Sequence, residues 1–100
     1  MSYFISDSEL ELKEIMPGCK ARIVHSKNMT IAYWEIEKAA EVPNHHHPAE
    51  QIVTMVAGKF EMVIDGETKI LSPGDKAVIP GNIPHSGKAL EHCKIIDVWS

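Results

Sequence analysis

Three of the six histidines in this 100-residue sequence stand in a row, and histidine is the commonest metal ligand among protein side chains. In extended backbone, successive side chains point to opposite faces. His45 and His47 therefore face one way, and His46 faces the other way. Gln51 shares the odd parity of the first pair if the extended conformation continues. This spacing predicts two imidazoles and one amide on the same side of the chain.

A third imidazole comes from the other half of the chain. His85 follows a turn-rich segment that contains two prolines. We expect His45, His47 and His85 to bind one divalent transition-metal ion, because imidazole nitrogen suits Zn, Ni, Fe and Mn without choosing among them. The alternative is that these histidines only share a polar loop or a patch of surface.

Gln51 is the predicted fourth ligand, through its amide oxygen. Because an amide adds no negative charge, the ion would keep its full charge and would polarise a substrate oxygen more strongly. Two alternatives remain: Gln51 only forms hydrogen bonds nearby, or Glu50 binds the ion in its place. His25, His46 and His92 have no motif around them, and we expect them to be solvated or hydrogen-bonded.

A carboxylate near the end of the sequence is the candidate acid or base. Asp97 lies between Ile96 and Val98. Burial among such neighbours disfavours the charged form of a carboxyl group and raises its pKa. A carboxyl group of that kind suits proton transfer in catalysis. The alternative is an aspartate on an edge strand that faces water.

Short strands separated by turns must position these residues. Turn signals at Pro17-Gly18, Asp65-Gly66 and Ser72 to Asp75 divide the sequence about every eight to twelve residues. About nine strands are expected, with residues 1–14 as an irregular arm that ends in a short strand and residues 38–44 as a proline-containing connection. The clearest predicted strands are Cys19 to His25, Met29 to Glu37, Gln51 to Ala57, Lys59 to Asp65, Thr68 to Leu71, Lys76 to Ile79 and Lys94 to Trp99. The pattern favours an all-β, antiparallel sandwich or barrel.

Size and charge restrict the partners. One hundred residues make one small domain with a limited core, so we expect a homodimer. The net charge of −4 and the scattered Lys and Arg residues argue against nucleic acid or an anionic membrane, and favour a small-molecule ligand. Neither a secretory leader nor an apolar run of membrane-spanning length is visible, so we expect a cytoplasmic location.

The remaining thiols and large apolar residues are expected to be structural. Cys19 and Cys93 could form a disulfide, although two free thiols suit a reducing cytosol better. We expect Trp34, Met55 and Met62 to pack in the core or at a dimer face.

Two segments resemble the motifs of the cupin family. The first family motif is Gly, five residues, His-x-His, three or four residues, Glu, six residues and Gly. The corresponding residues here are Ala39, His45, His47, Gln51 and Gly58. The second family motif is Gly, five residues, Pro-x-Gly, two residues, His, three residues and Asn. The corresponding residues here are Gly74, Pro80, Asn82, His85 and Ala89.

The resemblance covers about residues 30 to 99 and retains all three imidazoles. It implies an antiparallel double-stranded β-helix, the cupin jelly roll, with the metal ion inside the mouth of the barrel. It also implies a single domain, in which residues 1–28 form an N-terminal arm with the first strands and residues 29–100 form the cupin core.

A narrower likeness concerns the small cupins of pectin and alginate breakdown, which open unsaturated 4,5-uronate monosaccharides to linear keto forms. The shared segments are HxHPxEQ, IPxNxPHS and a terminal D-x-aromatic-S. This resemblance implies that Asp97 is catalytic and that Trp99 contacts the substrate. Those cupins continue after this serine with Pro, one residue and an Arg that grips the substrate carboxylate, whereas the present sequence ends at Ser100.

The leading hypothesis is therefore a metal-dependent enzyme that opens the ring of a small anionic sugar. Two alternatives remain open. One is a cupin that binds or senses a small ligand without turnover. The other is an iron dioxygenase, which would use open coordination sites on a redox-active metal and would consume O2.

Overall fold

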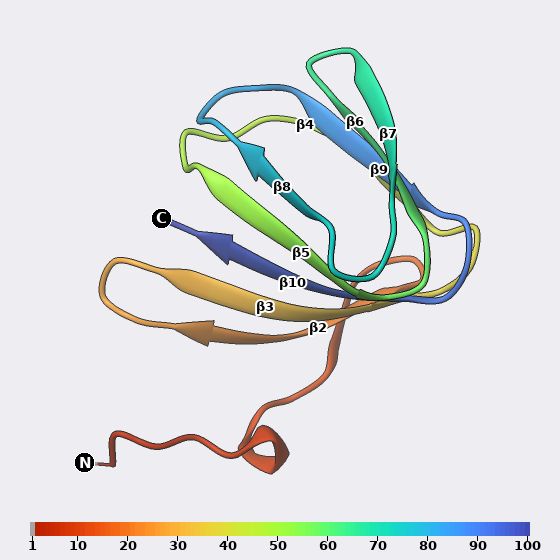
Figure 1. Cartoon of the computed structure of the whole chain (residues 1–100). Helices are drawn as coiled ribbons and strands as arrows, with labels where there is room; N and C mark the ends of the chain where they lie inside the picture. Colours follow the sequence, from red (N-terminus) through yellow and green to blue (C-terminus); the bar gives the residue numbers. More distant parts are fainter. Residues whose placement is uncertain (1) are drawn as a thin grey trace.

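The computed structural model describes residues 2–100, which form two antiparallel sheets that face each other (Figure 1). The larger sheet has six strands in the order β1-β2-β3-β10-β5-β8, and the smaller has four in the order β4-β9-β6-β7. The strands are β1 (Lys13–Met16), β2 (Cys19–His25), β3 (Thr30–Ile36), β4 (Glu41–His45), β5 (Gln51–Ala57), β6 (Phe60–Ile64), β7 (Glu67–Leu71), β8 (Lys76–Ile79), β9 (His85–Ala89) and β10 (Cys93–Trp99). The predicted all-β, antiparallel fold is confirmed.

The N-terminal segment before β1 lies outside the two sheets (Figure 1). It contains one short 3-10 turn, η1 (Asp7–Glu9), and its aromatic side chains are exposed. Within residues 2–100, no helix is both long and apolar enough to cross a membrane.

The core lies between the sheets and follows the alternation of the strands. In β10 the odd-numbered residues from Cys93 to Asp97 are buried, and in β5 Val53 and Met55 face them from the neighbouring strand. Met62 of β6 contributes to the same core from the smaller sheet. The prediction that Met55 and Met62 are core residues is confirmed, because both side chains belong to the buried cluster.

Two strands were not predicted, and each has a local cause. Residues 38–44 were expected to be a connection because of Pro43, but β4 occupies an edge of the smaller sheet, where a residue without an N–H is tolerated. Strand β9 contains Ser86 and Gly87, which are weak strand formers. It is held between β4 and β6, and the Phe60 ring lies where a side chain at Gly87 would be.

The two cysteines are free and buried, as expected. Cys19 and Cys93 both pair with Ile36, one from each side, so two strand spacings of roughly 4.8 Å separate them. A disulfide needs Cα atoms closer than about 7 Å. Burial raises the pKa of both thiols, which keeps them protonated.

Candidate metal centre and its cavity

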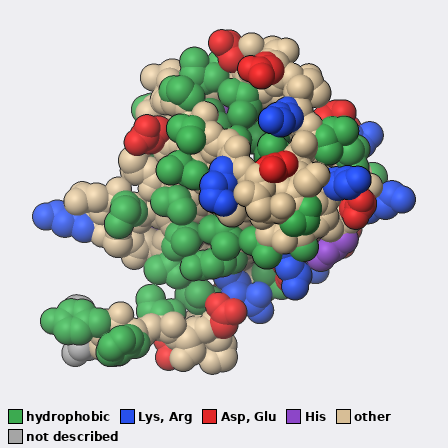
Figure 2. Space-filling view, in the orientation of Figure 1, with side chains coloured by type: hydrophobic (Ala, Val, Ile, Leu, Met, Phe, Trp, Pro, Cys, Tyr) green, Lys and Arg blue, Asp and Glu red, His purple; other side chains and the backbone are tan. Residues whose placement is uncertain are grey.

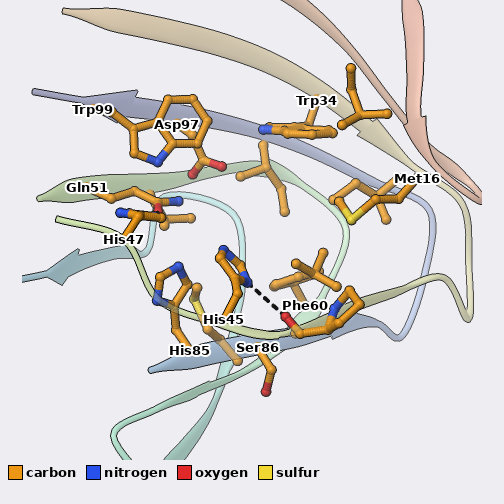
Figure 3. A pocket seen from close by; sticks show the side chains of 18 residues that line it. Met16, Trp34, His45, His47, Gln51, Phe60, His85, Ser86, Asp97 and Trp99 are labelled. Carbon is orange, nitrogen blue, oxygen red and sulfur yellow. Dashed lines mark hydrogen bonds between the residues drawn. The ribbon is translucent and has the colours of Figure 1, made fainter. Parts of the chain in front are cut away.

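A cavity of about 460 Å³ opens between the two sheets. Figure 3 shows His45, His47, His85 and Gln51 at one end of this cavity, and Met16 with other apolar side chains at the opposite end. The volume lies within the range of small-molecule sites in proteins.

The three predicted histidines converge at the first end of the cavity. His45 ends β4, His47 lies in the loop that follows, and His85 begins β9. His45 and His85 are direct cross-strand partners, and their ring centroids lie 4.2 Å apart. One ligand atom from each of the three rings lies within 4.8 Å of the others, so the cluster can hold a metal ion.

Hydrogen bonds to the backbone orient all three rings in the same way. In each histidine, Nδ1 lies 2.8 Å from a carbonyl oxygen two residues away, which belongs to Pro43, Ala49 or Ile83 for His45, His47 and His85 respectively. A carbonyl oxygen can only accept, so each Nδ1 carries the hydrogen. In a neutral ring Nε2 then presents a lone pair, which is the form that binds metals.

The state of His85 also fits a metal ligand. Its Nε2 atom is buried without a hydrogen-bond partner. Burial lowers the pKa of His85, and the neighbouring rings of His45 and His47 lower it further. Burial therefore favours the neutral ring, whose Nε2 lone pair no protein group among residues 2–100 satisfies.

Gln51, the predicted fourth ligand, faces the same cluster. Its Oε1 atom lies 3.1 Å from Nε2 of His47. Because His47 carries its hydrogen on Nδ1, two lone pairs would face each other across this distance. A cation shared by both atoms removes the conflict, and so does a rotated amide whose N–H donates to Nε2. The first arrangement makes Gln51 a ligand, and the second is the hydrogen-bonding alternative.

Asp97 lies inside the barrel and not on an edge facing water. Its side chain lines the cavity and its residue is only 8% exposed. Burial raises the pKa of Asp97 from 3.8 to about 6, although the polar side chains of Gln51 and Trp34 and the charge of His47 oppose the shift. Its Oδ1 atom is buried without a partner. Figure 3 shows this carboxyl group between Trp99 and Trp34, above Gln51.

Comparison with known sequences identifies the fold family. The sequence model of the cupin domain matches residues 32–99. The chain belongs to the cupin family. The motif residues His45, His47, Gln51 and His85 all line the cavity between the two sheets.

Three relatives of this cupin share nearly its whole length. It is 34% identical to the pectin degradation protein KdgF of Dickeya dadantii (strain 3937) over 98% of this chain and 91% of that protein. The structure of KdgF from Halomonas sp. superposes with a TM-score of 0.91 at 30% identity, covering 100% of this chain and 94% of that one. An RmlC-like cupin from Shewanella frigidimarina gives a TM-score of 0.93 at 25% identity, covering 100% and 91%. The expected likeness to a cupin of pectin breakdown is thus confirmed.

The four turn positions of the two motifs share one backbone conformation. Gly58 and Gly74 have φ angles of 84° and 91°, in the left-handed region that favours glycine. Ala39 and Asn82, which replace family glycines, have φ angles of 73° and 63°. Ala39 and Asn82 therefore adopt the same left-handed backbone conformation as the glycines of the motifs. Asparagine is comparatively well suited to this region, whereas alanine is strained there.

Trp34 has a role that the sequence did not reveal. It was expected to pack in the core or at a dimer face, and it does pack against the buried cluster. It also lines the cavity of this cupin, and its Nε1 atom is buried without a partner. The cross-strand pairs Trp34–Ile95 and Ala32–Asp97 place its indole beside the carboxyl group. Its parity within β3 matches this position, but only the register of β3 against β10 shows which residue it neighbours.

Proposed function

We propose that this cupin binds one divalent transition-metal ion through His45, His47, Gln51 and His85, and that it opens the ring of a small unsaturated uronate. The observation that carries the proposal is the buried carboxyl group of Asp97 in the same cavity as the three histidines. The similarity to pectin degradation proteins supports the choice of substrate class. When bound, the ion would supply a Lewis acid that polarises a substrate oxygen.

Asp97 would move the proton. With a pKa of about 6, it is accessible in both forms near neutral pH. The carboxylate accepts the proton of the anomeric hydroxyl, a carbonyl forms at C1, and the bond between C1 and the ring oxygen breaks. The ring oxygen then belongs to an enolate. Protonation of this enolate at C4 by the Asp97 carboxyl group gives the keto form, so the net change is an isomerisation without a co-reactant.

The indole rings of two tryptophans would enclose the part of the cavity in which Asp97 transfers the proton. Trp99 and Trp34 both line the cavity beside Asp97 (Figure 3). Their flat apolar faces exclude water from the carboxyl group and can pack against a sugar ring. The unpartnered N–H of Trp34 is in addition a hydrogen-bond donor at this wall.

The test is turnover by the metal-loaded protein. An unsaturated uronate monosaccharide absorbs ultraviolet light through its double bond, and ring opening with ketonisation removes that absorbance. Asp97→Asn should lower the rate roughly 10²- to 10⁴-fold with unchanged metal content, because it removes general acid-base catalysis. Asp65→Asn, at an exposed hairpin turn, is the matched control and should leave the rate unchanged.

Loss of metal together with loss of activity in Asp97→Asn would contradict the proton-transfer role. Full turnover by this variant would contradict it as well. A metal-loaded wild-type protein that leaves the absorbance unchanged would overturn ring opening altogether. Measured O2 uptake would instead indicate an oxygenase.

One observation favours a second candidate, a cupin that binds a ligand without turnover. The described lining of the cavity contains no Lys or Arg, and its end away from the histidines carries apolar side chains such as Met16 and Phe60. Such a surface suits a ligand with an apolar part. In that case Asp97→Asn should change ligand affinity little, and calorimetry would detect binding without any product.

A further inference from the structure

The wall that the larger sheet contributes to the cavity changes from polar to apolar along the strands. Gln51 and Asp97 lie at the histidine end. The next inward residue of β10 is Ile95, which pairs with Trp34, and the row after that contains Ile36. Strand β10 has seven residues, and at about 3.3 Å per residue its inward positions extend over about 20 Å. A single sugar ring fills only part of this length.

The smaller sheet shows the same change. His85 begins β9, and two residues later Gly87 pairs with Met62. The Phe60 ring lies beside Gly87, where any side chain would collide with it. Figure 3 shows Phe60 and Met16 at the end of the cavity opposite the histidines. The inner half of the cavity is therefore apolar on both walls, whereas the outer half carries the polar groups.

A donor and an acceptor without partners mark the boundary between the two halves. The Nε1–H group of Trp34 and the Oδ1 atom of Asp97 are both buried, and neither has a hydrogen-bond partner among residues 2–100. Figure 3 shows the indole nitrogen on the side of the ring that faces the carboxyl group. A hydroxyl group can accept a hydrogen bond from an N–H and donate one to a carboxyl oxygen. One hydroxyl group of a ligand at this boundary would therefore satisfy both side chains.

The charge that attracts a ligand comes from the histidine end. Figure 2 shows Lys and Arg side chains on the outer surface of the molecule, and none lines the described cavity. The predicted ligands of the ion, three imidazoles and the Gln51 amide, are uncharged, so the ion keeps its full positive charge. A carboxylate of the ligand should therefore lie at this end.

We propose that the cavity binds a hydroxy acid with an apolar tail. Its carboxylate lies at the three histidines, and its hydroxyl group lies between Trp34 and Asp97. An aryl or branched alkyl tail fills the inner half beside Phe60. The inference rests on the metal site of the proposed function and not on ring opening, because it concerns binding alone.

Calorimetry on the zinc-loaded full chain tests the proposal with three probes, lactate, 3-phenyllactate and 3-phenylpropionate. The wild type should bind 3-phenyllactate about 10- to 100-fold more tightly than lactate, because the phenyl ring becomes buried. It should bind 3-phenyllactate about tenfold more tightly than 3-phenylpropionate, which lacks the hydroxyl group. The zinc content of each sample is measured in parallel, and uronate turnover plays no part in these measurements.

Two variants separate the tail from the hydroxyl group. Met16→Ser removes an apolar side chain from the inner half, so it should weaken the binding of 3-phenyllactate about 3- to 10-fold and leave lactate unchanged. Trp34→Phe keeps an aromatic ring without the N–H. It should reduce the preference for 3-phenyllactate over 3-phenylpropionate from about tenfold to about threefold. Met29→Ser is the matched control for Met16→Ser, because Met29 is 59% exposed between β2 and β3, and it should change none of these affinities.

Each other result overturns the proposal. Equal affinities of zinc-loaded wild type for lactate and 3-phenyllactate would exclude the apolar subsite, and equal affinities for the two phenyl compounds would exclude the hydroxyl position. Equal losses in Met16→Ser and Met29→Ser would mean that the tail does not lie in the inner half. A wild-type protein that holds no zinc would overturn the metal site together with this inference. The comparison of probes on the wild type needs no substitution, so it decides the matter even where a variant does not fold.

Discussion

The two walls of the cavity are built differently. The smaller sheet and the loop after β4 supply the histidines, of which His45 and His85 are cross-strand partners. The larger sheet supplies Gln51, Asp97 and both indoles, from β5, β10 and β3. The first wall carries the groups that can hold a metal ion. The second wall carries the group that can move a proton.

The difference lies in what orients each side chain. Every histidine ring is set by a carbonyl oxygen two residues away, so its orientation is encoded locally. Asp97 has no local partner of this kind. Its burial depends on β10 lying between β3 and β5, where it pairs with Ala32 and Val53. The orientation of the histidine rings is thus a property of short segments, whereas the burial of Asp97 is a property of the sheet register.

The largest effect should come from the histidine wall. His45→Ala with His47→Ala removes two of the three converging imidazoles, so about one bound ion per chain should fall to none. Metal analysis of protein purified without a His-tag measures this change. His46→Ala changes the exposed histidine of the same run and should keep the ion. Retention of metal by the double variant would show that the ion is bound elsewhere.

A substitution of Asp97, in the opposite wall, should instead change the stability of the folded protein. In chelator-treated protein the pKa of Asp97 is about 6, against 3.8 for the ordinary group. Between these pH values the folded protein binds more protons at this site than the unfolded chain does, so the buried carboxylate lowers stability as the pH rises. Asp97→Asn should therefore increase the free energy of unfolding by up to ~3 kcal/mol at pH 7.5.

Urea titrations at several pH values check this prediction. The gain from Asp97→Asn should shrink as the pH falls through 6 and approach zero only below about pH 3, where the carboxyl group is protonated in both states. A variant that is less stable than the wild type at pH 7.5 would mean that the carboxylate is well solvated or paired in the folded protein.

The same difference decides how much the sequence could reveal. The alternation argument placed His45 and His47 on one side and His46 on the other, and the structure agrees, although β4 ends at His45. Most strands were predicted from their β-branched and apolar residues. Strand β9 was not, because Gly87 and its neighbours are weak strand formers and pairing with two other strands stabilises it. The contact between β4 and β9 is therefore invisible in the sequence.

For the opposite wall, sequence reasoning left more open. The residues around Asp97 allowed either burial or exposure, and only the central position of β10 decides between them. Trp34 was predicted to pack in the core or at a dimer face, and nothing local in the sequence links it to Asp97. The proximity of Gln51 to Asp97 likewise requires the pairing of β5 with β10.

Gln51 comes from the wall that contains Asp97 but faces the histidines. A single substitution tests whether its amide binds the metal ion or only forms a hydrogen bond with His47. If its amide oxygen is a metal ligand, Gln51→Glu should tighten metal binding about tenfold, because the new charge attracts the cation. If the amide only donates to Nε2 of His47, a carboxylate cannot replace that bond and the affinity should fall. Competition with a chelating dye measures the sign of the change. Glu50→Gln tests the exposed neighbour and should have no effect.

The smallest predicted effect concerns the turn that leads into the histidine wall. Ala39 has a φ of 73°, and the Ala39 N–H donates to the Ala89 carbonyl at 2.8 Å, which ties the start of this wall to β9. Since a left-handed conformation costs alanine about 1–2 kcal/mol and glycine pays mainly in entropy, Ala39→Gly should stabilise the protein by roughly 1 kcal/mol. Thermal unfolding should detect this as a rise of about 4–8 °C in Tm.

Ala40→Gly, one residue later, is the comparison variant, because its φ is not positive. Glycine there adds flexibility to the unfolded chain and removes a methyl group that packs against the core. It should lower the Tm. Metal affinity should be unchanged in both variants, since the carbonyls that orient the histidine rings lie outside this turn. A change in metal affinity with Ala39→Gly would mean that the histidine wall depends on long-range strand pairing as much as the Asp97 wall does.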